Sequence, residues 1–294
     1  MNDLAPIVLF VYNRPWHTRQ TVEALQKNEL AQESELFIYA DGPKNKEVRP
    51  KVQEVKQYIH SITRFKKVHI VERENNWGLA NNIVDGVTTI VNRFGKIIVL
   101  EDDLVTSPFF ITYMNKALQL YKNVENVYSV SANMFPIEDS LRKTVLLPLI
   151  ATWGWGTWKT QWDSASWVND DYNIMFQSQE LQKRFNLADY SYIDILKLPF
   201  SKSWGIRWYF HVFKRNGLSV YPTRSLIKNV GLDGSGENCR VNENYKINLA
   251  DYIDVIKQLN IDLNFYAKIL NYFTNNEKKD SSASVIKRII KKNF

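Results

Sequence analysis

Residues 96–104 read KIIVLEDDL, a short apolar segment that ends in three consecutive acids, Glu101, Asp102 and Asp103. An apolar run of this length is typical of a strand covered on both faces. Three carboxylates directly after a buried strand repel one another unless something cationic lies beside them. One or two carboxylates, together with substrate phosphates, are usual ligands for Mg²⁺ in proteins. We therefore expect a Mn²⁺ or Mg²⁺ site here. The alternative is that Asp102 or Asp103 caps a helix starting near Pro108.

Strands and helices alternate through the first 130 residues. The apolar runs predict strands at Ile7–Tyr12, Leu36–Ala40, Val68–Val71, Lys96–Leu100 and Val127–Val130. Apolar residues at three- and four-residue spacing predict helices at Thr18–Lys27, Pro50–Ile62, Leu79–Val91 and Pro108–Tyr121. This order predicts an α/β fold with a mostly parallel sheet and helices on both faces.

Polar residues follow each of the first four predicted strands. They are Asn13 and Arg14, then Asp41, then Arg73, then the acids from Glu101 onward. Ligands of parallel sheets bind beyond the carboxyl ends of the strands, so we expect one polar cleft along this edge.

Individual roles can be proposed for the side chains of this cleft. Asp41 could accept a hydrogen bond from a nucleobase edge, and Arg14 could reach a phosphate or hold the base-binding acid. Asn81 and Asn82, in the helix that starts near Leu79, could bind ribose or phosphate. The competing interpretations are an ordinary Asp-Gly turn, a surface ion pair, and helix capping by a preceding asparagine.

Tryptophan is concentrated in one part of the chain. Seven of the nine tryptophans lie between Trp153 and Trp208, and residues 153–158 read WGWGTW. Indole faces stack on sugars, and intervening glycines let a ligand approach the backbone, so this region is predicted to bind a saccharide acceptor. The alternative is a set of core tryptophans. The predicted acceptor residues are Trp153, Trp155, Trp158, Trp204 and Arg207.

Length and composition bound the organisation of the chain. With 294 residues and 45% hydrophobic residues, it can bury a sizeable core. We expect one domain over residues 1–245, with a donor half at about 1–135 and an acceptor half at about 136–245. Residues 246–294 are predicted to be helical, with a flexible joint at Thr274–Ser284.

The net charge of +7 is concentrated partly at the C-terminal end. In Val285–Phe294, four isoleucine or valine residues recur at helical spacing and four basic residues fill the other face. Such a helix suits an anionic membrane surface, although packing on its own domain is the alternative. Because the charge does not follow a groove, a nucleic-acid partner is not expected. With Cys239 as the single cysteine and no secretion signal, we expect a cytoplasmic protein, peripheral on the inner face of the plasma membrane.

Several of these motifs resemble a known family. Tyr12-Asn13-Arg14, Ala40-Asp41-Gly42, the acids with Pro108-Phe109-Phe110, the Trp-Gly repeat and Asn229–Gly236 resemble bacterial glycosyltransferases of the GT-A (nucleotide-diphospho-sugar transferase) fold. The sequence is also similar to the Golgi N-acetylglucosaminyltransferase that initiates complex N-glycans. This resemblance covers most of residues 6–240 and implies transfer of a sugar from a nucleotide-sugar donor to a glycan or lipid-linked acceptor in surface polysaccharide synthesis.

The resemblance also implies residue roles. Asp103 would be the direct metal ligand, Glu101 and Asp102 would contact the ribose and nearby nucleotide, and Asp41 with Arg14 would hold the base, with UDP favoured. Transfer would invert the anomeric carbon, which requires a general base on the acceptor hydroxyl.

The general base is where the chain departs from the Golgi enzyme. That enzyme has an acid directly before the tryptophan that matches Trp204, whereas this chain has Lys202-Ser203. Asp194 is our first candidate for the base, with Asp163 and Asp233 as alternatives. Without a base the chain would be a pseudoenzyme.

Two other functions are considered. A non-catalytic carbohydrate-binding protein would use the tryptophan-rich region and would not need the three acids. A sugar nucleotidyltransferase would need a glycine-rich loop after the first strand, and residues 13–16, NRPW, contain no glycine. His17, like the other histidines, shows no metal-ligand spacing and is expected to be a surface or core residue.

Overall fold

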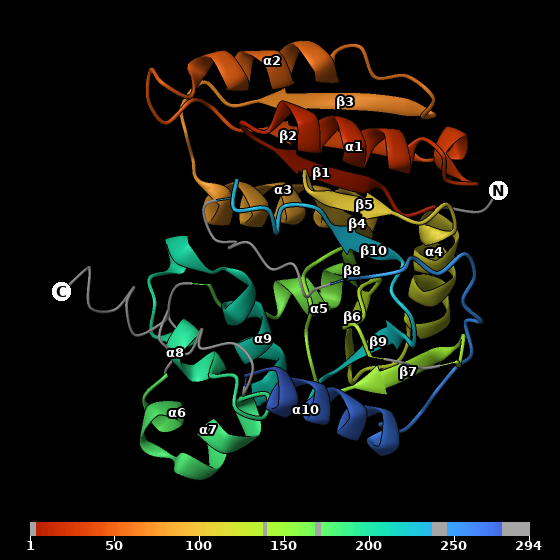
Figure 1. Cartoon of the computed structure of the whole chain (residues 1–294), viewed down its shortest axis with the longest axis vertical. Helices are drawn as coiled ribbons and strands as arrows, with labels where there is room; N and C mark the ends of the chain where they lie inside the picture. The colour runs from red at the N-terminus through yellow and green to blue at the C-terminus, as the bar shows by residue number, and fades with distance from the viewer. Residues whose placement is uncertain (1–3, 138–139, 168–171, 237–245, 278–294) are drawn as a thin grey trace.

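The computed structural model describes residues 4–137, 140–167, 172–236 and 246–277 (Figure 1). The strands are β1 Ile7–Val11, β2 Glu35–Ala40, β3 Lys67–Glu72, β4 Lys96–Glu101, β5 Leu104–Thr106, β6 Val127–Ser131, β7 Thr144–Leu147, β8 Trp155–Trp158, β9 Leu218–Pro222 and β10 Ile227–Asn229. The helices are α1 Pro15–Leu25, α2 Arg49–Ile59, α3 Leu79–Phe94, α4 Phe110–Tyr121, α5 Lys159–Asp163, α6 Asn173–Gln177, α7 Gln179–Phe185, α8 Tyr192–Leu196, α9 Gly205–Lys214 and α10 Leu263–Glu277, and short 3₁₀ turns lie at Ala31–Glu33 and Phe200–Lys202.

The main sheet has eight strands in the order β3-β2-β1-β4-β8-β6-β9-β7. Strands β3, β2, β1 and β4 are parallel. Strand β8 is antiparallel to both β4 and β6, so β6 and its parallel neighbour β9 run in the same direction as β4. The carboxyl ends of β1, β2, β3, β4, β6 and β9 therefore lie along one edge. The prediction of a mostly parallel sheet is confirmed.

Both faces of the sheet are covered, as the continuous apolar strands predict. On β1, Ile7, Leu9 and Val11 pack with α1, α2 and α4, whereas Val8 and Phe10 pack with α3, α5 and α9 on the other face. All five residues are buried. Alternate side chains of a strand point to opposite faces, which explains why no polar residue interrupts this strand.

The helix boundaries differ from the predicted ones by a few residues, at the start of some helices and at the end of others. Helix α1 begins at Pro15 and not at Thr18, because a proline at the first helical position already has a helical φ. Helix α3 continues to Phe94, three residues beyond its predicted end. The first five predicted strands all form.

The C-terminal part is less helical than predicted. Residues 246–262 are not helical: Asp254 and Ile261 form isolated parallel bridges with Lys143 and Leu146, beside the edge strand β7. Helix α10 starts only at Leu263 and runs through part of the predicted joint, to Glu277. The predicted basic tail, Val285–Phe294, lies outside the described residues.

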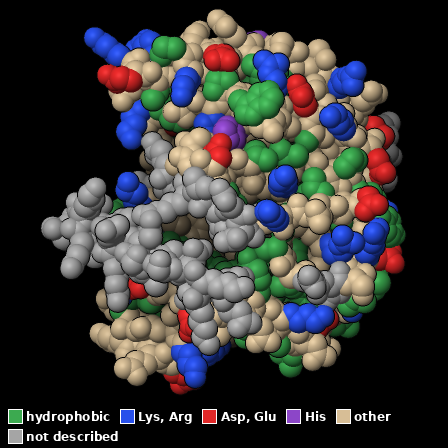
Figure 2. Space-filling view, viewed as in Figure 1, with side chains coloured by type: hydrophobic (Ala, Val, Ile, Leu, Met, Phe, Trp, Pro, Cys, Tyr) green, Lys and Arg blue, Asp and Glu red, His purple; other side chains and the backbone are tan. Residues whose placement is uncertain are grey.

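The described surface shows no single dominant charge on the face drawn in Figure 2, where lysine and arginine side chains are interspersed with aspartate and glutamate side chains. Within the described ranges, none of the helices is both long and apolar enough to cross a bilayer.

Candidate functional site

The three acids singled out in the sequence lie where the chain turns from β4 into β5. Glu101 is the last residue of β4, and Asp102 and Asp103 form the turn. The extended segment therefore ends at Glu101. Arg14 forms ion pairs with both aspartates: its Nη2 contacts Asp102 Oδ1 and lies 2.9 Å from Asp103 Oδ2.

Arg14 is brought to the acids by the parallel pairing of β1 with β4. It directly precedes α1, just beyond the carboxyl end of β1. On the next turns of α1, the Thr21 hydroxyl donates a hydrogen bond to the Asp102 carbonyl at 2.8 Å. Burial opposes the charge of Arg14, but its pKa is nevertheless raised because Asp102 and Asp103 stabilise the guanidinium. Arg14 and the acids thus share the polar edge of the sheet, as expected, but Arg14 holds Asp102 and Asp103 and not the proposed base-binding acid Asp41.

The acids carry more negative charge than Arg14 can balance. Burial, followed by the charges of Asp103 and Asp102, raises the pKa of Glu101 to about 8. The pKa of Asp102 is also raised, first by burial, with Arg14 opposing. Asp102 Oδ2 is buried and has no hydrogen-bond partner among the described residues. A buried, unpartnered carboxylate oxygen is costly, so the geometry favours a further cation at this point.

A divalent cation fits this donor set. Within the part of the chain that the structure describes, no group of three or more His, Cys, Asp or Glu side chains forms a metal cage. One or two carboxylates with the remaining ligands from phosphates and water is the ordinary arrangement for Mg²⁺ bound with a nucleotide. Asp102 and Asp103, only 3% and 6% exposed, are two neighbouring carboxylates of this kind.

A distant segment closes over the acids. Strand β10 pairs with β5, and the next residue, Val230, donates its N–H to the Asp103 carbonyl at 2.8 Å. Gly231 follows: a Cβ there would lie 2.3 Å from Asp103 Oδ2. Only glycine therefore lets the backbone approach the carboxylate so closely.

Asp233, one of the candidate bases, lies in the same segment. Its Oδ2 is 3.0 Å from His17 Nε2, on the face of α1 that also carries Arg14. The Ser235 side chain and N–H, followed by His17, lower the pKa of Asp233 to about 2. His17 is buried, which agrees with the expectation of a surface or core residue, but its contact with Asp233 was not predicted. Its spacing from Arg14 and Thr21 along one helix face was the sequence signal that could have identified it.

Asp41 does not present a free carboxylate to a base. Its Oδ1 accepts from the N–H groups of Gly42 and Trp77, and its Oδ2 accepts from Gly78 N–H and the Asn76 side chain, all at 2.8–3.0 Å. A carboxylate has about four acceptor sites, and these contacts use them. In this geometry Asp41 fixes the loop before α3, and the prediction that it reads a nucleobase is not realised.

Arg73, Asn81 and Asn82 also have structural partners. Arg73 contacts Asp85 and the Asn82 side chain, and its guanidinium lies 3.8 Å from the centre of the Trp77 ring. Asn81 donates to the Trp77 carbonyl at 3.0 Å. The N-cap of α3 is Gly78, so the competing interpretation, capping by a preceding asparagine, is wrong. Asn13 lies in the turn between β1 and α1.

The predicted acceptor tryptophans form a core. Trp155 is 0% exposed and Trp204 is 4% exposed, and Trp158 is also buried, with its indole N–H donated to the Leu118 carbonyl. The ring of Trp155 lies 5.5–6.2 Å from those of Trp162, Trp204 and Trp208. These side chains have no face free for a sugar, so the stacking prediction is wrong for them.

The glycines between the tryptophans serve strand packing. A Cβ at Gly156 would lie 2.7 Å from the Ile97 carbonyl of β4, and one at Gly154 would lie 2.6 Å from the Ile227 side chain. Trp153 is half-buried against the core. Arg207 is buried and donates to the carbonyls of Leu196 and Leu198, so it positions α8 and is not a ligand of an acceptor.

The other two candidate bases lie elsewhere. Asp163 pairs with Lys159, whose N–H bonds to the Gly95 carbonyl just before β4 begins. That is the amino end of β4, opposite the acids, so Asp163 cannot serve this site. Asp194 lies at the start of α8 and pairs with Lys197 at 3.1 Å.

Three solved structures are similar to this chain. A structure of a mannosyltransferase from Pyrobaculum calidifontis, in complex with GDP-Man and Mn²⁺, is 13% identical, with a TM-score of 0.36, covering 54% of this chain and 48% of that chain. TarS from S. aureus is 9% identical, with a TM-score of 0.40 and coverages of 76% and 36%. Mouse xyloside xylosyltransferase 1, in its apo form, is 11% identical, with a TM-score of 0.37 and coverages of 72% and 81%.

This chain thus spans about half the length of the mannosyltransferase. No curated protein sequence matches it. The family profile described as "Glycosyl transferase family 2" matches residues 7–181, which include β1 to β4, Arg14 and the three acids. The mostly parallel sheet with its helices is the GT-A fold, as predicted. Because the match spans more than half of the chain, the chain belongs to glycosyl transferase family 2.

Proposed function

We propose that the chain is a metal-dependent, inverting glycosyltransferase that moves a sugar from a nucleotide-diphosphate donor to a glycan or lipid-linked acceptor. A UDP-sugar is the favoured donor, with a hexosyl or N-acetylhexosaminyl group. The observation that carries the proposal is the Arg14–Asp102–Asp103 cluster at the carboxyl edge of the sheet, in which Asp102 Oδ2 has no partner among the described residues.

The three acids have different proposed roles in binding the donor. Asp103 is the proposed direct ligand of Mn²⁺ or Mg²⁺, and Glu101 and Asp102 lie beside the ribose and nucleotide. The bound cation would neutralise charge on the departing diphosphate. Arg14 fixes the two aspartates relative to each other, because one guanidinium contacts both. Val230 and Gly231 also lie against Asp103.

The general base remains a choice between Asp194 and Asp233. A base works best when its pKa lies near the working pH, so a pKa of about 2 makes Asp233 a weak base while it is paired with His17. Asp194 is paired only with a solvent-accessible lysine. Replacing the true base by asparagine is expected to lower kcat by about 10²–10⁴ without weakening donor binding. A chain whose activity survives both Asp194→Asn and Asp233→Asn uses another base.

The donor site is tested by thermal shift and calorimetry with UDP, GDP, CDP and dTDP, each with and without Mn²⁺. We expect one diphosphate to stabilise the wild type only with metal and to lose this effect in Asp103→Ala. Asp163→Ala is the matched control, since it removes an acid from the opposite end of β4 and should leave binding unchanged. If no nucleotide binds, the glycosyltransferase proposal fails.

The alternatives lose support from the same observations. A carbohydrate-binding protein would need exposed indoles, and Trp155, Trp158 and Trp204 are buried. A sugar nucleotidyltransferase would need a triphosphate loop after β1, where Pro15 instead begins α1. A pseudoenzyme would bind donor and metal but release no nucleotide when acceptors are supplied.

The proposed setting is bacterial surface polysaccharide synthesis at the inner face of the plasma membrane. The resemblance to the Golgi N-acetylglucosaminyltransferase, the cytoplasmic location and the absence of a nucleic-acid partner stay predictions from sequence. Deleting residues 284–294 should weaken binding to vesicles of anionic lipid if the basic tail contacts membrane. Unchanged vesicle binding would rule out that role.

A further inference from the structure

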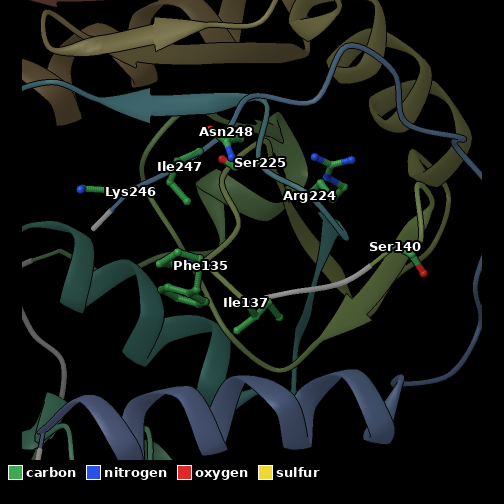
Figure 3. A pocket seen from close by; sticks show the side chains of 9 residues that line it. Phe135, Ile137, Ser140, Arg224, Ser225, Lys246, Ile247 and Asn248 are labelled. Carbon is green, nitrogen blue, oxygen red and sulfur yellow. The ribbon is translucent and has the colours of Figure 1, made fainter. Parts of the chain in front are cut away.

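A second recess lies on the acceptor half of the molecule. It is a cavity of about 620 Å³, within the usual size range of small-molecule sites, and Figure 3 shows the side chains around it. Phe135 and Ile137 form an apolar side, and Arg224, Ser225, Lys246 and Asn248 contribute polar groups. None of the candidate residues predicted from the sequence lies in its lining.

The cavity opens at the same edge of the sheet as the acids. Its lining residues Phe135 and Arg224 follow the carboxyl ends of β6 and β9, and both strands run parallel to β4. The two segments are joined by a hydrogen bond from Leu226 N–H to the Ala132 carbonyl at 2.8 Å. The chain then continues through β10 to Gly231, which lies against Asp103. One continuous segment therefore connects the cavity to the proposed donor site.

The charges on the described residues of the cavity are positive. Arg224 and Lys246 line it, and none of its described lining residues is an acid. In the described ranges, 4–137, 140–167, 172–236 and 246–277, neither cation lies within ion-pair distance of a carboxylate. Two other basic residues do have carboxylate partners: Arg142 pairs with Asp251 at 3.3 Å, and Lys143 pairs with Asp262 at 3.8 Å.

The two cations lie on opposite sides of the recess in Figure 3, with the Phe135 and Ile137 side chains along another side. Two cationic residues in the lining of one cavity suit an anion with two charges better than a single carboxylate. The Asn248 amide adds hydrogen-bonding capacity, and the apolar side suits a carbon-rich neighbour of the anion.

We infer that this cavity binds a phosphate group carried by the acceptor, with Arg224 and Lys246 as its ligands. The inference rests on the proposed glycosyltransferase function and adds the class of acceptor. The phosphate could belong to a lipid carrier or be a substituent of the glycan itself, and both share the chemistry of a phosphate ester. The acceptor would then extend from this cavity to the proposed metal site at Asp103.

The test measures phosphate binding without the donor. Phenyl phosphate is titrated into the full chain in EDTA, so that metal-dependent binding near Asp103 does not contribute. Arg224→Gln and Lys246→Gln are each expected to weaken binding by about tenfold or more, since each removes one charge-assisted contact. Lys228→Gln is the matched control, because Lys228 is exposed on β10 and does not line the cavity.

Further ligands distinguish the sources of the phosphate. Octyl phosphate binding more tightly than glucose 6-phosphate supports a lipid carrier, and the reverse order supports a phosphorylated glycan. Neutral octyl glucoside should bind much more weakly than octyl phosphate. The inference is overturned if no phosphate binds, if the double variant binds phosphates as well as wild type, or if the neutral ligand competes equally.

The same samples separate this inference from the proposed function. UDP with Mn²⁺ should stabilise the Arg224→Gln/Lys246→Gln variant as much as the wild type. Donor binding without phosphate binding would remove only the acceptor inference. Phosphate binding without any nucleotide binding would instead remove the glycosyltransferase proposal and leave an anion site.

Discussion

Two clusters are buried to the same extent: the acids at the end of β4 and the tryptophans around β8. They differ in the kind of buried polar group that lacks a partner. Asp102 and Asp103 are as inaccessible as Trp158 and Trp204. The tryptophan rings pack against one another. The indole N–H groups of Trp155 and Trp208 nevertheless lack hydrogen-bond partners in the described part of the chain. A buried neutral N–H costs far less than a buried unpaired charge.

This comparison shows that burial alone does not separate a core from a site. The balance of charge does so: Asp102 and Asp103 share one guanidinium, and burial followed by their charges raises the pKa of Glu101. The tryptophans should therefore govern stability, and the acids should govern ligand binding at some cost in stability.

The largest expected effect is on the tryptophan side. Trp155→Ala removes a fully buried indole and should lower the free energy of unfolding by about 3–5 kcal/mol, measured by urea denaturation. Trp16→Ala is the control, because Trp16 is 66% exposed and its loss should change stability by about 0.5 kcal/mol or less. If Trp155→Ala kept its stability and lost saccharide binding instead, the tryptophans would be the site.

The next effect concerns Arg14. Arg14→Ala leaves Asp102 and Asp103 without their shared cation and should cost about 3 kcal/mol, at the lower end for a broken buried ion pair. Saturating Mn²⁺ should restore part of this loss, so the metal-induced rise in Tm should be larger in the variant than in the wild type. A smaller rise would mean that Arg14 is needed to form the metal site itself.

The sequence predicted the first half of the fold well because its strands are continuous apolar runs. Such short runs are typical of strands with both faces covered, and β1 to β4 and β6 formed as expected. The second half failed because its elements depend on distant partners. Strand β8 inserts between β4 and β6, and its glycines are explained by Ile97 and Ile227, far away in sequence.

The site was predicted in part for the same reason. Arg14 and the acids follow adjacent strands, so local sequence placed them together. His17 and Gly231 were missed as contacts because the partner of each lies more than 100 residues away, Asp233 for His17 and Asp103 for Gly231. The contacts of Asp41 were missed because three of its four hydrogen bonds come from Asn76, Trp77 and Gly78, which only the fold brings near.

A moderate effect is expected at Gly231. Gly231→Ala places a methyl group against Asp103 Oδ2 and should cost about 1–3 kcal/mol of stability by overpacking. The displaced carboxylate should also weaken metal-dependent nucleotide binding, measured by calorimetry with Mn²⁺. Val230→Ala is the control, since it shortens the neighbouring side chain but keeps the N–H that bonds to the Asp103 carbonyl. Equal binding by both variants would show that Asp103 does not contact the ligand.

The last expected effect is a pH dependence carried by Glu101, which is small within any one pH unit. Its pKa is about 8 in the folded protein, above the ordinary value of 4.5, so between these limits the unfolded chain releases a proton that the folded protein retains. Stability without metal should therefore fall as pH rises from about 4.5 to 8, by at most about 1.4 kcal/mol per pH unit for one group. Glu101→Gln removes this contribution, and the difference in Tm between wild type and variant should grow in favour of the variant over this range. Parallel Tm curves would mean that Glu101 is already ionised in the metal-free protein, with its charge balanced by Arg14 or by solvent. The acids would then need a second cation less than the unpartnered Asp102 Oδ2 implies.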